Sequence, residues 1–69
     1  MVIAFELEDR YIELYKLLKV LDLVESGGEA KLIIAEGYVR RNGTVETRKR
    51  AKIEAGETIE VGDVIIEVE

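Results

Sequence analysis

The order of apolar and polar positions divides the chain into helical and extended segments. Residues 2–7, VIAFEL, form a short β-branched and aromatic run that predicts a strand. A stripe of apolar residues at helical spacing then predicts a helix over residues 10–21: Tyr11, Leu14, Tyr15, Leu17, Leu18 and Leu21. We expect Asp9 to cap the start of this helix and Asp22 to end it in the left-handed conformation.

A second helix is predicted from Ser26 to the residue before Gly37. Glu29 follows Ser26 by three residues, which is the capping-box spacing that satisfies two N–H groups at a helix start. Apolar residues continue at helical spacing, and Gly37 suits the left-handed position after a last turn. Because only a short link separates the two helices, an αα-hairpin is expected.

The remaining chain reads as strands and turns. Asn42-Gly43 between residues 38–41 and 44–47 predicts a tight β-hairpin. Beyond it, Ile53 stands as an isolated apolar anchor, and Ala55-Gly56 turns the chain.

A second hairpin is predicted around Gly62-Asp63. Apolar residues alternate with polar or acidic ones before and after this turn, so one face is apolar and the other acidic. The predicted fold is therefore α+β in the order β-α-α-β-β-β-β, with a two-helix hairpin packed on a small sheet. At 69 residues, we expect one domain spanning residues 1–69.

The amino-acid composition limits the reactive and metal-binding groups that this chain can offer. The chain has no cysteine and no histidine, which removes thiol nucleophiles and the usual zinc ligands. Its hydroxyl groups therefore have no histidine base, and its carboxylates are scattered along strand faces, so we expect no enzyme activity, metal or cofactor. Apolar runs are too short for a membrane span or a signal peptide, which predicts a cytoplasmic protein without a membrane partner.

Charge is unevenly distributed along the chain. The net charge is −5, yet six of the ten basic residues and only one acidic residue fall between Arg40 and Lys52. A polyanion responds to such a local field rather than to the net charge. Alternatively, the charges only solvate a hairpin edge and discourage strand pairing between molecules.

The stretch Ser26 to Ile53 resembles the S-four (S4) RNA-binding domain, the αL motif. The resemblance rests on a helix opening Ser-Gly-Gly-Glu-Ala-Lys, then Glu-Gly-x-Val, then Asn-Gly-x-Val-Glu-Thr-Arg-Lys-Arg-x-Lys-Ile. The resemblance extends from Leu23 to Asp63. Within the family, this stretch is more narrowly similar to the small stand-alone, ribosome-associated bacterial branch, the YbcJ type. The resemblance implies non-catalytic binding of structured RNA, with ribosomal RNA as the expected partner and no small-molecule substrate.

Position by position, the resemblance implies RNA contacts on the second helix and after the first hairpin. Bare N–H groups at a helix start favour an anion, and glycines let a phosphate approach them. Alternatively, the glycines serve close helix packing. The charge segregation adds three basic residues, which gives the full candidate site: Ser26, Gly27, Gly28, Lys31, Arg40, Arg41, Arg48, Lys49, Arg50 and Lys52. Lys16 and Lys19 are expected in solvent, with further phosphate contacts as the alternative.

Three positions depart from the family pattern. Gly27 stands where larger members often have arginine, and Asp22 replaces a usual glycine between the helices. Arg41 stands where an inward valine is usual, so either that strand end is exposed or the basic patch is enlarged.

Two other interpretations remain open at this stage. The strict agreement of pattern, caps and turns is also typical of a designed or idealised domain that has no selected ligand. A protein-interaction module would instead use the acidic sheet face, with Glu60 and Glu67 as its test positions. We expect a monomer.

Overall fold

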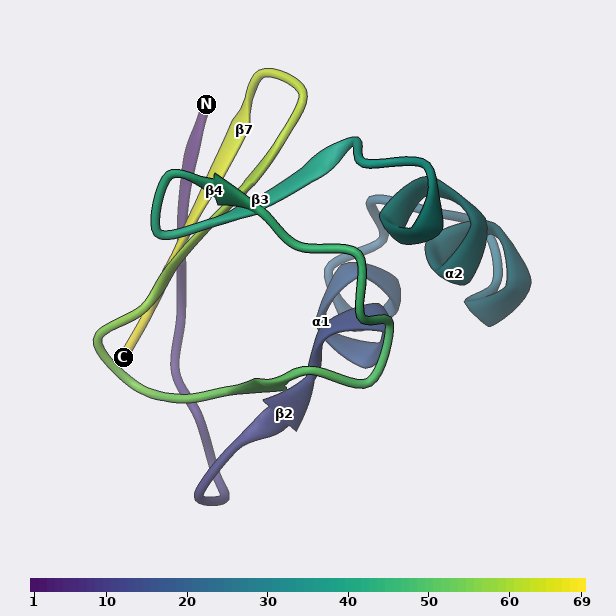
Figure 1. Ribbon diagram of the computed structural model, residues 1–69. Helices are drawn as coiled ribbons and strands as arrows, with labels where there is room; N and C mark the ends of the chain where they lie inside the picture. Colours follow the sequence, from purple (N-terminus) through teal and green to yellow (C-terminus); the bar gives the residue numbers. More distant parts are fainter.

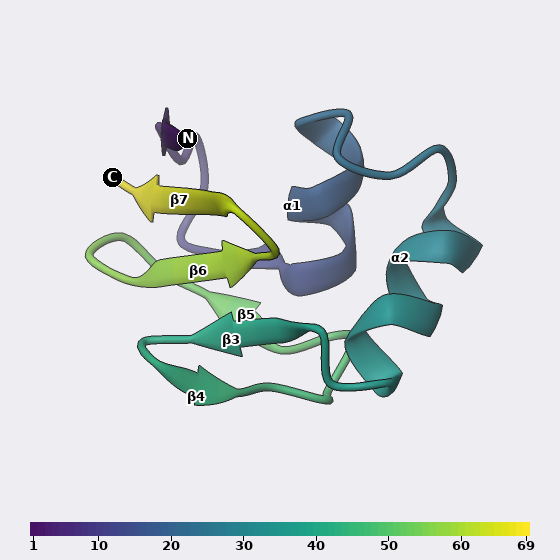
Figure 2. The ribbon, with the colours of Figure 1, turned by 90° about the horizontal axis from the view of Figure 1, so that it is seen from above.

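Two helices lie beside a mixed β-sheet in the computed structural model, which describes residues 1–69 (Figures 1 and 2). The elements in chain order are β1 (Val2–Phe5), β2 (Ile12–Glu13), α1 (Leu14–Val20), α2 (Gly27–Ala35), β3 (Val39–Arg41), β4 (Thr44–Val45), β5 (Lys52–Ile53), β6 (Thr58–Val61) and β7 (Val64–Val68). The α+β class and the helical hairpin are confirmed. The structure adds two short strands, β2 and β5, to the predicted order.

The main sheet has the strand order β1-β7-β6-β3-β4. Only the β1–β7 pair is parallel, and the other neighbours are antiparallel. Figure 2 shows β7, β6, β3 and β4 side by side with both helices to one side of them. The smaller sheet pairs β2 with β5, where Ile12 faces Ile53.

One hydrophobic core joins the helices to the main sheet. The helices contribute Leu14, Leu17, Leu18 and Ile34, each with no exposed surface. The main sheet contributes Val39, Ile59 and Ile66, which point to the same side of it, and β5 of the smaller sheet contributes Ile53; all four are equally buried. The helical spacing therefore identified the core, although Tyr11 is exposed.

The prediction that the first helix starts at residue 10 is wrong. Residues 12 and 13 are extended, and α1 begins at Leu14 with Glu13 as its N-cap, so Asp9 caps nothing. The reason is tertiary. The N–H groups of Leu14 and Tyr15 donate to the carbonyls of Ala51 and Lys49, at 2.9 and 3.0 Å, so a distant segment replaces a local cap.

The predicted start of the second helix is confirmed, with one change in the capping box. Ser26 Oγ accepts from the N–H of Glu29 at 3.1 Å. The Glu29 carboxylate accepts in turn from the N–H of Glu25, at 3.2 Å, rather than from Ser26. At the helix ends, Asp22 and Gly37 have φ values of 57° and 85°, as the left-handed predictions require.

The first hairpin has the predicted turn but shorter strands. Asn42 and Gly43 have φ values of 51° and 85°, the geometry of a type I′ turn. The strand after the turn ends at Val45.

Neither helix is long and apolar enough to cross a membrane. No group of three or more acidic side chains is placed to hold a metal ion.

Candidate nucleic-acid interface

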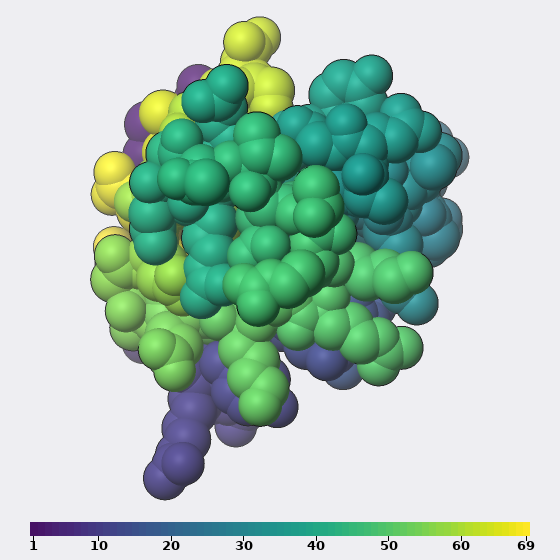
Figure 3. All heavy atoms as spheres, viewed as in Figure 1, coloured from purple at the N-terminus to yellow at the C-terminus, as the bar shows by residue number.

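The segment Arg48–Lys52, here called the basic segment, crosses the first turn of α1. Its carbonyls at Lys49 and Ala51 accept from the α1 N–H groups, while the side chains of Arg48, Lys49 and Arg50 are exposed. Figure 3 shows this green part of the chain exposed on the face that also displays α2, in teal. Backbone bonding to α1 therefore fixes the basic segment, and the exposed side chains of Lys49 and Arg50 make no ion pair within the domain.

The start of α2 presents two glycines that packing does not require. A Cβ atom on Gly27 would lie 3.9 Å from the Tyr15 ring, and one on Gly28 would lie 3.8 Å from Ser26 Oγ. Both distances are ordinary van der Waals contacts, and neither glycine has a positive φ. Close helix packing therefore does not explain the glycine pair, and the open approach to the helix start remains its simplest use.

Cations from three segments surround the ring of Tyr15. Lys31 Nζ lies 4.7 Å from the ring centroid, Arg50 Cζ lies 5.8 Å away, and Lys16 Nζ lies 5.9 Å away. The structure thus brings Lys31 of α2 and Arg50 of the basic segment to one place, next to Gly27. The sequence interpretation missed Tyr15, because its spacing assigned it only to the apolar stripe. A second tyrosine, Tyr11, lies 5.1 Å from Lys52 Nζ.

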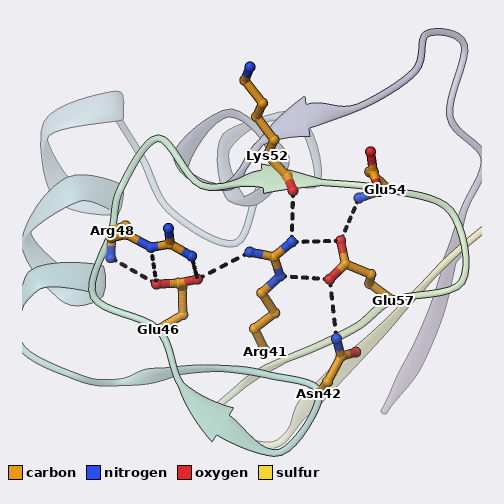
Figure 4. Close-up of polar contacts among 7 residues, drawn as sticks. All are labelled: Arg41, Asn42, Glu46, Arg48, Lys52, Glu54 and Glu57. Atoms are coloured by element: carbon orange, nitrogen blue, oxygen red, sulfur yellow. Dashed lines mark hydrogen bonds and ion pairs between the residues drawn. The ribbon is translucent and has the colours of Figure 1, made fainter.

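Arg41 does not join this surface. It lies on the same side of β3 as the buried Val39, and its half-buried guanidinium is held by carboxylates and a carbonyl of other segments (Figure 4). It donates to both oxygens of Glu57, at 2.6 and 3.0 Å, to the Lys52 carbonyl at 2.9 Å, and to Glu46 at 3.3 Å. Neither sequence alternative for Arg41 holds: the position remains inward, and carboxylates from other segments balance the charge.

Glu46 is the charged residue that the fold buries. It is 9% exposed, and it accepts from the backbone N–H of Arg48 and from that side chain at 3.0 Å (Figure 4). The side-chain hydrogen bonds from Arg48 are the main reason that the pKa of Glu46 is lowered to about 2, against the opposing effect of burial. Arg48 is therefore paired with Glu46 while most of its side chain remains exposed to solvent.

Glu57 has the corresponding role for Arg41. Its hydrogen bonds from Arg41 lower its pKa, and they raise the pKa of Arg41 in turn. It also accepts from Asn42 and from the N–H of Glu54, at 3.1 and 2.7 Å. Figure 4 shows Glu57 between these donors, so the network connects the first hairpin to the turn before β6.

The candidate residues other than Arg41 and Arg48 lie in three places. Arg40 is exposed on the opposite side of β3 from Arg41, opposite Val45 of β4 and Glu60 of β6. Lys52 is exposed beside Tyr11. The structure gathers Gly27, Lys31 and Arg50 around Tyr15, with Ser26 and Gly28 adjoining at the helix start and Lys49 adjoining in the basic segment. Arg40 is not part of this group, because it lies on the side of β3 that faces away from the core.

A helical hairpin with a capped Ser-Gly-Gly start, followed by a β-hairpin and a basic segment, defines a domain of the αL class. Comparison of the sequence with family models agrees. The model described as S4 domain matches residues 5–69, and the chain therefore belongs to the S4 domain family.

Individual proteins of known sequence or structure are also similar to this chain. The chain is 55% identical to YbcJ of Escherichia coli (strain K12) over 49 residues, which is 71% of this chain and 70% of that protein. It matches YbcJ of Shigella flexneri to the same extent. A solution structure of E. coli YbcJ, described as an αL motif involved in RNA-binding, superposes with a TM-score of 0.71 and 45% identity. That match covers 94% of this chain and 84% of the other.

Proposed function

We propose that this domain binds structured RNA without catalysis, through the basic segment and the start of α2. The observation that carries the proposal is that Lys31 and Arg50 both lie against the Tyr15 ring, beside that helix start, without an ion-pair partner. Unpaired, clustered cations suit the phosphate backbone of a polyanion. The similarity to YbcJ, whose αL motif is described as involved in RNA-binding, supports the same ligand class.

Three finer points belong to the same proposal. The RNA is ribosomal, the domain acts as a monomer, and its compartment is the cytoplasm. The support is the resemblance to the small ribosome-associated branch of the family. Co-sedimentation with ribosomal subunits tests the first point, and sedimentation equilibrium of the purified protein tests the second.

Titration of a fluorescently labelled RNA stem-loop over a series of salt concentrations tests the main proposal. For the unaltered protein, log affinity should fall linearly with log salt concentration. Arg50→Ala or Lys31→Ala should reduce that slope by about 0.7 to 0.9, because each removes one phosphate contact. Arg50 is a cleaner test position than Arg48, since loss of Arg48 also removes the main ion-pair partner of Glu46.

Lys19→Ala is the matched control, because it removes one positive charge from the last turn of α1. It should leave the slope unchanged. A reduction equal to that of Arg50→Ala would show that the interface also includes Lys19 of α1. Lys49→Glu combined with Arg50→Glu should abolish binding while the protein remains folded, because both residues are exposed and neither makes an ion pair. Absence of binding by the unaltered protein at low salt would overturn the proposal.

A further inference from the structure

Two kinds of partner hold the basic side chains of this domain. Arg41 and Arg48 are held by the carboxylates of Glu46 and Glu57. Lys31 and Arg50 make no such pair, and the group that they share is the ring of Tyr15. The chemical difference matters, because a carboxylate cancels the charge that it positions, whereas an aromatic ring does not.

The Tyr15 ring can hold cations through its electron-rich face. Lys31 Nζ and Arg50 Cζ lie 4.7 and 5.8 Å from its centroid, within the range in which the ring quadrupole attracts a cation. Lys16 lies at 5.9 Å but is also paired with Glu13 at 3.4 Å, so its charge is partly balanced. Lys31 and Arg50 are therefore the two cations at the ring that have no carboxylate partner.

The backbone fixes where this ring sits. The N–H of Tyr15 donates to the Lys49 carbonyl at 3.0 Å, in the residue directly before Arg50. On the α2 side, Gly27 has no side chain, and its nearest ring atoms would be 3.9 Å from a Cβ. Tyr15 thus adjoins both α2, through its ring, and the basic segment, through its N–H.

We propose that Tyr15 is a positioning residue of the RNA site: its ring holds Lys31 and Arg50 together as a phosphate-binding pair while leaving both charges available. This inference rests on the proposed function. Without the ring, two mobile cations would have to be ordered when the RNA binds, and that ordering lowers affinity. The hydroxyl group of Tyr15 has no part in this role, so phenylalanine should replace it.

The test compares Tyr15→Phe with Tyr15→Leu in binding to the labelled RNA stem-loop at one salt concentration. Tyr15→Phe should keep the affinity within about twofold, because the ring face is retained. Tyr15→Leu should lower it about threefold to tenfold, as expected for the loss of two cation–ring contacts. Tyr38→Leu is the matched control: Tyr38 is 64% exposed, has no cation over its ring, and should give no change.

A double-mutant comparison separates positioning from the other roles of a tyrosine. In a Lys31→Ala/Arg50→Ala background, Tyr15→Leu should have no further effect on affinity, because the cations it positions are gone. If the loss persists there, Tyr15 contacts the RNA directly, by stacking on a base, or it supports only the fold, and the proposal is overturned. Equal affinities of Tyr15→Leu and the unaltered protein would also overturn it.

A titration of the unaltered protein with inorganic tripolyphosphate, followed by nuclear magnetic resonance, tests the pair without RNA and without a substitution. The side-chain signals of Lys31, Arg50 and the Tyr15 ring should shift together with one dissociation constant, while those of Arg41 stay fixed. Shifts of equal size at all exposed lysines and arginines would overturn the pairing. If the stem-loop does not bind but tripolyphosphate does, the proposed function fails and the phosphate-binding pair stands.

Discussion

Arg41 and Glu57 are sixteen residues apart in the chain and form a two-bond ion pair, with Arg41 Nε 2.6 Å and Nη2 3.0 Å from the two carboxylate oxygens. The pair connects the end of β3 to the turn before β6. Arg41 also donates to the Lys52 carbonyl, which connects the main sheet to β5. An arginine that a charge count assigns to an RNA-binding surface therefore helps to hold the fold together.

The first prediction concerns this ion pair. Arg41→Met should lower the free energy of unfolding by about 2 to 4 kcal/mol, because it leaves the largely buried carboxylate of Glu57 without an ion-pair partner and removes one of the two partners of Glu46. Urea unfolding followed by circular dichroism measures the change. Arg40→Met is the control on the adjacent, exposed position, where the expected change is within about 0.5 kcal/mol. Equal effects at both positions would contradict a structural role for Arg41.

The second prediction concerns acid. Glu46 has a folded-state pKa of about 2 against an ordinary value of 4.5, and that of Glu57 is lowered too. The unfolded chain therefore binds more protons between these values, so stability is fully present above about pH 4.5 and falls as the pH drops toward 2. Glu46 should account for about 2 kcal/mol of that loss, after allowance for solvent screening at the exposed Arg48.

Urea midpoints at pH 7, 4 and 2 measure this dependence. Glu46→Gln should be less stable at neutral pH and should lose less stability on acidification than the unaltered protein. Glu67→Gln is the control, since Glu67 is exposed and makes no ion pair. A parallel pH dependence in Glu46→Gln and the unaltered protein would show that Glu46 does not supply the effect.

The third prediction tests the turn between β3 and β4. Gly43 has a φ of 85°, where a β-branched side chain is strained, so Gly43→Val should lower stability by about 1 to 2 kcal/mol. Gly28→Ala is the contrasting glycine substitution. Its φ is not positive and a Cβ there would make only an ordinary contact with Ser26 Oγ at 3.8 Å, so the expected result is an unchanged or slightly higher melting temperature. Similar losses in both variants would mean that backbone conformation is not the cause.

The fourth prediction tests the core face of α2. Ile34 is fully buried, so Ile34→Asp should unfold the domain by placing an unpaired carboxylate among apolar side chains. Leu32→Asp makes the same chemical change two residues away, where the side chain is 57% exposed, and should leave the protein folded. Far-ultraviolet circular dichroism and a melting curve distinguish the two. A native spectrum for Ile34→Asp would place Ile34 outside the core.

Local sequence was sufficient wherever the determining interactions are local. The Ser26 cap, the left-handed residues Asp22 and Gly37, and the Asn42-Gly43 turn each depend on residues within one turn of each other, and each was predicted correctly. Apolar spacing similarly identified the buried faces of both helices. The family resemblance rested on the same stretch, which is why the sequence alone led to the αL motif.

Tertiary structure decided the start of α1 and the division of the basic residues. Helical spacing extended α1 back to residue 10, but pairing of Ile12 with Ile53 keeps that part extended. Charge counting placed Arg40 and Arg41 in one patch, yet adjacent residues on a strand point to opposite sides. Which cation is balanced by a carboxylate and which lies against Tyr15 depends on segments distant in the sequence, because ion pairs and cation–ring contacts form only where the folded chain brings their partners within a few ångströms.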